Sequence, residues 1–176
     1  MMIMKASIKY LLLLGLLLMT ACGYHLRGTI ALPVGLKTMY VMGFSGVMRS
    51  ELQAILRASE GKFVPTADEA GIVIKVSKED LRRRALSIGS TGKSSEIELS
   101  YYLRFQFYDN KNNPLLEEQT LELTREFFND QTALLAKVNE ELLITKEMYK
   151  QAARMIMTRA QIAVETQPKI VEKQPK

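Results

Sequence analysis

The strongest constraint on the fold is an alternating stretch, EIELSYYLRFQFY, which runs from Glu96 to Tyr108. Its apolar and aromatic residues fall on every second position, and the positions between them are mostly polar, which gives the apolar set Ile97, Leu99, Tyr101, Leu103, Phe105 and Phe107. A period of two is that of a β-strand with one face in a core and the other face in water. This stretch therefore predicts a long strand of the antiparallel type.

Other periodic segments predict the elements around this strand. Short apolar runs between glycines predict strands, a period of 3.6 predicts helices, and DNKNNP predicts a hairpin turn at 109–114. In chain order these patterns give a strand at 37–42, a helix at 46–59, a strand at 71–76 that continues toward residue 88, the strand at 96–108, a return strand at 115–128 and a helix at 131–164. Phe63 and Val64 are expected to add a short extended piece.

The order β-α-β-β-β-α predicts the α+β class. We expect a two-layer α/β sandwich, in which a mostly antiparallel or mixed four-stranded sheet carries two helices on one face. The last predicted helix is about 50 Å long at 1.5 Å per residue, which exceeds the sheet that it covers. An overhanging end or a loose first turn is therefore expected. The single domain is predicted over residues 37–164 and a disordered tail over 165–176, where prolines and charges leave little to bury.

The N-terminus has the layout of a secretory signal peptide over residues 1–21. Lys5 and Lys9 precede an apolar run at 10–19, and small residues follow it. The apolar run is about half the roughly 20 residues that a membrane-spanning helix needs. Export is therefore predicted, with residues 22–36 as an N-terminal tether that leads into the domain.

Cys22 is the only cysteine, so in an oxidising compartment it must pair with another chain, remain a free thiol or be modified. Its position favours modification, because Met19 to Cys22 (MTAC) resembles the lipobox of bacterial lipoproteins. That resemblance implies cleavage before Cys22 and acylation of this residue, and several acyl chains give stable membrane attachment. Gly23 stands where an aspartate would retain the protein at the inner membrane, so the outer membrane, facing the periplasm, is expected.

Catalytic and metal-binding sites are not predicted. Cys22 and His25 lie three residues apart, but an acylated sulfur is a thioether and cannot act as a nucleophile. One histidine and a blocked cysteine leave only scattered carboxylates as metal ligands. Phosphate loops, dinucleotide fingerprints and GxSxG motifs are also absent from the sequence. We therefore expect neither enzyme activity nor a cofactor or metal.

The densest positive patch is the run Arg82, Arg83 and Arg84. On an extended segment Arg82 and Arg84 share one face and Arg83 points to the other. Such a run either protects an edge strand by its charge or binds an anionic partner through its guanidinium groups. Nucleic acid is not the expected anion, because the chain is predicted to be exported and its net charge is only +5.

Two sequence blocks resemble the LptE family of lipopolysaccharide-assembly lipoproteins. The first is CGYHLR at residues 22–27, and the second combines REFF at 125–128, ALLAK at 133–137 and KEMY at 146–149. The resemblance implies a two-layer α/β fold, no enzyme activity, and a role as a plug inside the LptD β-barrel that helps insert lipopolysaccharide (LPS) into the outer leaflet.

The resemblance also implies direct LPS binding by basic residues, one of which corresponds to Lys137. The second basic position of the family aligns with Ser90, so Lys93 or the Arg82–Arg84 run is hypothesised to replace it in contacts with lipid A phosphates. The alternative is a generic outer-membrane lipoprotein that acts as a periplasmic ligand-binding or regulatory module, for which the fold would be equally suitable.

Overall fold

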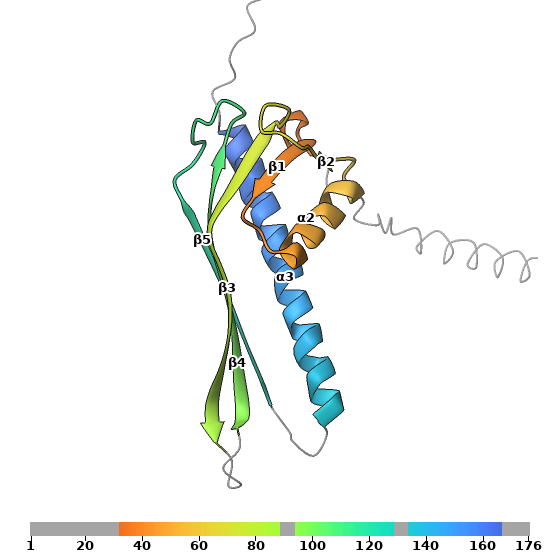
Figure 1. Ribbon diagram of the computed structural model, residues 1–176, viewed down its shortest axis with the longest axis vertical. Helices are drawn as coiled ribbons and strands as arrows, with labels where there is room; N and C mark the ends of the chain where they lie inside the picture. Colours follow the sequence, from red (N-terminus) through yellow and green to blue (C-terminus); the bar gives the residue numbers. More distant parts are fainter. Residues whose placement is uncertain (1–31, 89–93, 129–133, 167–176) are drawn as a thin grey trace, which may run out of the picture. The chain divides into compact units, whose positions relative to one another are not determined.

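The computed structural model describes residues 32–88, 94–128 and 134–166. The elements in these ranges are η1 (Val34–Leu36), β1 (Thr38–Met42), α2 (Gly46–Ala58), β2 (Lys62–Phe63), β3 (Ile72–Ile88), β4 (Ser94–Tyr108), β5 (Gln119–Phe128) and α3 (Leu134–Glu165). Figure 1 shows α2 and α3 beside a sheet whose long strands are β3, β4 and β5. The predicted α+β class is confirmed.

The sheet has five strands in the order β2-β1-β3-β4-β5, not the four that the sequence predicted. β1 pairs in parallel with β2 and β3, whereas the β3–β4 and β4–β5 pairs are antiparallel. The extra strand is Lys62–Phe63, which pairs with Thr38 and Met39. A two-residue strand is too short to show a period, so the sequence indicated only an extended piece there.

The alternation of β4 sorts its side chains between core and surface as predicted. The six residues from Ile97 to Phe107 that occupy every second position are each 2% exposed or less. They join the inward residues of α2 and α3 in one apolar cluster, so both helices cover the same face of the sheet. A smaller cluster of Val64, Ala70 and Val73 lies on the opposite face near the end of the sheet that contains β1.

The packed part of the chain begins before β1. Leu32 and Leu36 are buried in the main cluster, although they fall within the range predicted as a tether. η1 brings Gly35 close to Gly71, so that a Cβ atom on Gly71 would lie 2.2 Å from the Gly35 carbonyl oxygen. The Gly71 amide also donates to both oxygens of Thr38. This close backbone approach requires glycine at position 71.

Among the side chains of α3 that the structure describes, the buried ones begin at Met148. Four of them are alanines with no exposed surface, which lets the helix approach the sheet and α2 closely: Ala152, Ala153, Ala160 and Ala163. In the N-terminal half, none of the side chains from Lys137 to Glu147 is fully buried, and Leu142 and Leu143 are each more than 60% exposed.

A hydrogen-bonded carboxylate joins the start of α2 to β3. Ser45 is the N-cap of α2, and its hydroxyl accepts from the Met48 amide. The Glu79 carboxylate accepts from the Ser45 amide and the Ser45 hydroxyl, each at 2.6 Å, and from the Tyr101 hydroxyl at 3.1 Å. Burial, together with the Glu79 charge, raises the pKa of Tyr101, so this hydroxyl stays protonated and donates.

The Glu79 contacts predict a stability loss on substitution. Glu79→Gln replaces one acceptor oxygen by a donor that faces the Ser45 amide or hydroxyl, so we expect the free energy of unfolding to fall by about 2 kcal/mol. Urea denaturation followed by circular dichroism measures this change. The control is Glu118→Gln, which removes a solvent-exposed partner of Arg104 and should cost less than about 1 kcal/mol. Equal losses in the two variants would contradict the anchoring role.

The close approach of η1 and Gly71 predicts a second effect. Gly71→Ala forces the Gly35 backbone to move and should lower the free energy of unfolding by about 2–3 kcal/mol. Gly46→Ala is the matched control, because a Cβ there meets nothing within 4 Å and alanine is the better helix former. Thermal denaturation of both variants checks the prediction, and an unchanged melting temperature for Gly71→Ala would refute it.

Candidate functional site

The predicted arginine run lies in the second half of β3, where that strand is an edge of the sheet. The pairing of β3 with β1 ends at Lys75, and beyond that point the described part of the sheet pairs β3 with β4 alone. The register between β3 and β4 shifts at Ser77, where a β-bulge lies between Val76 and Lys78. The edge position that the sequence indicated for the arginines is therefore confirmed.

Strand alternation divides the three arginines between the two faces of the sheet. Arg83 opposes the buried Leu99, and its Nε lies 3.2 Å from the Glu141 carboxylate of α3. Arg82 opposes Ser100 and Arg84 opposes Glu98, on the face that carries no helix. The predicted separation of Arg83 from the other two is confirmed.

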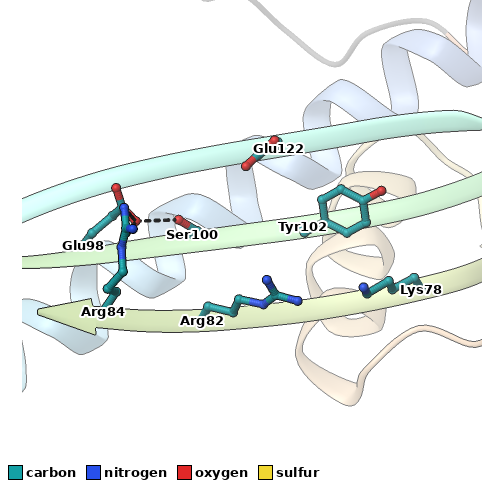
Figure 2. A pocket seen from close by; sticks show the side chains of 7 residues that line it. All are labelled: Lys78, Arg82, Arg84, Glu98, Ser100, Tyr102 and Glu122. Atoms are coloured by element: carbon teal, nitrogen blue, oxygen red, sulfur yellow. Dashed lines mark hydrogen bonds and ion pairs between the residues drawn. The ribbon is translucent and has the colours of Figure 1, made fainter.

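The helix-free face has a groove with a volume of about 300 Å³ beside Arg82 and Arg84. Three strands line it, and Figure 2 shows the side chains over β3, β4 and β5 with the helices behind the sheet. The lining residues are Lys78, Arg82 and Arg84 from β3, Glu98, Ser100 and Tyr102 from β4, and Glu122 from β5. The β3 side of the groove is positively charged, whereas the β4 and β5 sides supply carboxylates.

The three cations of the groove differ in how far they are paired. Arg84 Nη2 lies 3.0 Å from Glu98 Oε1, and the Arg84 Nε donates to the same oxygen. Arg82 uses its Nε for Asp80 at 2.7 Å, and its side chain is 68% exposed. Lys78 makes no ion pair with any residue that the structure describes, and its Nζ lies 5.4 Å from the ring centroid of Tyr102.

Tyr102 lies in the middle of the groove. Arg104, the next residue of β4 on the same face of the sheet, holds the Tyr102 side chain in place. Arg104 Nη2 donates to the Tyr102 hydroxyl at 3.0 Å, and the Arg104 guanidinium lies 5.9 Å from the ring centroid. The hydrogen bond to Tyr102 raises the pKa of Arg104, whose second partner is Glu118. The groove thus presents a positioned aromatic ring between cationic and anionic walls.

The structure does not bring Lys137 into this groove. Lys137 lies near the start of α3, its side chain is only 19% exposed, and its Nζ is 2.6 Å from Glu140. Glu141, about one helical turn further on, is the residue that contacts Arg83, so Lys137 belongs to the helix side of the sheet. Cys22, Ser90 and Lys93 lie outside the described residues.

Sequence reasoning did not include Lys78, Glu98, Ser100 or Glu122 in the candidate site. The sequence contains one sign of Lys78 as a member of the site. Lys78, Arg82 and Arg84 are separated by even numbers of residues, which puts the three cations on one face of an extended strand. The partners on β4 and β5 depend on the strand register, which the sequence does not specify. Tyr102 occupies one of the intervening positions of the alternating stretch, and these positions are expected to face water.

The described ranges of the chain contain no group of three or more histidine, cysteine or acidic side chains placed to hold a metal ion. None of the helices in these ranges combines the length and the apolar composition that a membrane crossing requires.

Comparisons with known proteins agree on one family. A sequence profile described as "LptE: Lipopolysaccharide-assembly" matches residues 36–160. The LPS-assembly lipoprotein LptE of Photorhabdus laumondii is 30% identical over 83% of this chain and 81% of its own length. The protein of the same name from Pectobacterium atrosepticum is 29% identical over 84% of this chain and 82% of its own length.

A solved structure shows the same fold. The solution structure of lipoprotein B from Nitrosomonas europaea matches with a TM-score of 0.67 at 26% identity, and it covers 82% of this chain and 94% of that chain. The range that the profile matches contains all five strands, the whole of α2, and α3 as far as Ala160. This chain therefore belongs to the LptE family of lipopolysaccharide-assembly proteins.

Proposed function

We propose that this chain is a lipid-anchored protein of the outer membrane that assists the insertion of LPS into the outer leaflet, as a non-enzymatic partner and plug of the LptD β-barrel. The observation that carries this proposal is the family match over residues 36–160. Both curated relatives are named LPS-assembly lipoproteins, which supports the same role for a chain that shares about 30% of its residues with them.

A plug needs a rigid domain whose surface is compatible with a polar, wet lumen. The helix-free face of the sheet has that character, because hydrogen bonds and ion pairs order its side chains. Arg104 contacts Tyr102 and Glu118, and Tyr108 donates to Gln106. An ordered polar face of this kind supports the proposal that the domain sits in a wet lumen.

Attachment to the membrane is proposed to depend on Cys22. In this proposal the signal peptide of residues 1–21 is removed, and acyl chains on Cys22 hold the protein at the periplasmic side of the outer membrane. Residues 22–36 lead from this anchor toward the domain, whose packed residues include Leu36.

Binding of LPS is proposed to use phosphate contacts with basic residues. Lipid A phosphates bind divalent cations that hold LPS molecules together, and guanidinium or ammonium groups compete for the same oxygens. The candidates are Lys137 and Lys93 together with Arg82 and Arg84, the two members of the arginine run that face the groove. Arg83, the third member of the run, is paired with Glu141 on the helix side of the sheet and is not proposed as a contact.

The proposed partnership predicts co-purification with a large β-barrel protein. Affinity purification of the full-length chain from detergent-solubilised outer membranes should recover LptD in near-equal amount, and depletion of the chain should lower LPS at the cell surface. The alternative, a generic periplasmic ligand-binding or regulatory lipoprotein, predicts neither result. If no barrel is recovered and surface LPS is unchanged, the proposed function is wrong.

The proposed LPS contact predicts a specific effect at Lys137. Lys137→Gln should weaken binding of the detergent-solubilised full-length chain to immobilised LPS by about fivefold, because one charge-assisted phosphate contact is lost. Lys150→Gln is the matched control, since Lys150 also lies on α3 and also pairs with a glutamate three residues away. An equal effect of both substitutions, or of neither, would exclude a specific contact at Lys137.

A further inference from the structure

The groove on the helix-free face has side chains of opposite charge on its two sides. Lys78 and Arg82 come from β3, and Glu122 comes from β5 on the far side of β4. Tyr102 lies between them and is paired directly with Glu122 in the strand register. A ligand that fits this groove therefore needs an anionic end toward β3 and a hydrogen-bond donor toward β5.

Two of the cations are available to such an anion. Arg84 is engaged by Glu98 through two of its nitrogens, but Arg82 contacts Asp80 through Nε alone, which leaves both terminal nitrogens of its fork for a ligand. Four residues of extended strand separate the backbones of Lys78 and Arg82 by about 13 Å. Figure 2 shows both charged tips pointing toward each other along β3, so they can bind one anion together.

A terminal phosphate is the anion that suits this pair. An arginine fork and a lysine ammonium provide several donors to its oxygens, and phosphate accepts from both geometries. Both side chains are exposed, and that of Arg82 is 68% exposed. A phosphate on a larger molecule therefore reaches both without entering a closed cavity.

The remaining lining distinguishes a phosphorylated sugar from free phosphate. The Tyr102 ring, fixed by Arg104, offers a flat surface on which the C–H face of a pyranose ring packs. Glu122 is exposed and forms no ion pair within the described residues, so its carboxylate can accept from sugar hydroxyl or amide groups.

We infer that the groove is a binding site for a phosphorylated hexose, with its phosphate on Lys78 and Arg82, its ring on Tyr102 and its hydroxyl or amide groups on Glu122. This inference rests on the proposed function, because it assigns the phosphosugar headgroup of LPS to this face of the sheet. It leaves Arg83 out of the site and gives Arg84 the role of ordering Glu98.

The probe for this site is N-acetylglucosamine 1-phosphate, which has the phosphate, the ring and the donor groups but no acyl chains. We expect it to shift amide resonances of residues in β3, β4 and β5 of the full-length chain in detergent micelles. N-acetylglucosamine and inorganic phosphate, each alone, should give much weaker shifts. Equal shifts with inorganic phosphate alone would overturn the sugar assignment.

Variants then locate the site. The double variant Lys78→Gln/Arg82→Gln should weaken binding of the probe by about tenfold or more, since both phosphate contacts are lost. Arg83→Gln is the matched control on the other face of the same strand and should change binding by less than about twofold. Tyr102→Leu keeps apolar volume but loses the flat ring, and it should also weaken binding. Circular dichroism confirms that each variant is folded.

A parallel arm with purified LPS separates this inference from the proposed function. If the wild-type chain binds LPS and the double variant binds it equally well, the headgroup site is wrong while the LPS-binding role stands. If the wild-type chain binds the probe but not LPS, a free sugar phosphate is the ligand, and the LPS-binding role fails. If neither the probe nor LPS binds, both are wrong.

Discussion

The whole domain depends on the two-residue alternation of β4. This strand lies between β3 and β5, so its register sets which side chains of all three strands face the helices. One set of positions, from Ile97 to Phe107, forms the floor of the core. The other set, which includes Ser100 and Tyr102, forms the floor of the groove. A slip of one residue would exchange the two, so the register is fixed by the cost of exposing the core.

Contacts between β3 and the helices hold the two layers together at two separate points. Near the middle of β3, Glu79 accepts hydrogen bonds from the N-cap of α2 and from Tyr101. Further along, Arg83 contacts Glu141 in the stretch of α3 from Lys137 to Glu147, where no side chain is fully buried. The first contact is partly buried and shared by three donors, whereas the second is an exposed pair. We therefore ascribe most of the polar contribution to layer packing to Glu79.

The sequence predicted the fold class because its main elements show clear periods. The strand at 96–108 and the helices at 46–59 and 131–164 match β4, α2 and α3 to within three residues at each end. The fifth strand was missed because two residues cannot show a period. The groove was only partly predicted. Arg82 and Arg84 lie close together in the sequence, whereas Glu98 and Glu122 lie near them only because the strands pair. Lys93 and Cys22 remain predictions.

The bulge at Ser77 changes which alternate side chains of β3 point toward the helices. Before it, even-numbered residues such as Ile74 and Val76 face the helices; after it, odd-numbered residues such as Glu79 and Arg83 do. An unbroken ladder from Val76 onward would have turned Arg82 and Arg84 toward the core side and Arg83 toward the groove. One extra residue thus allows a single strand to be buried in its first half and charged and exposed in its second. The number of residues between the paired start of β3 and the arginines determines which arginines face the groove.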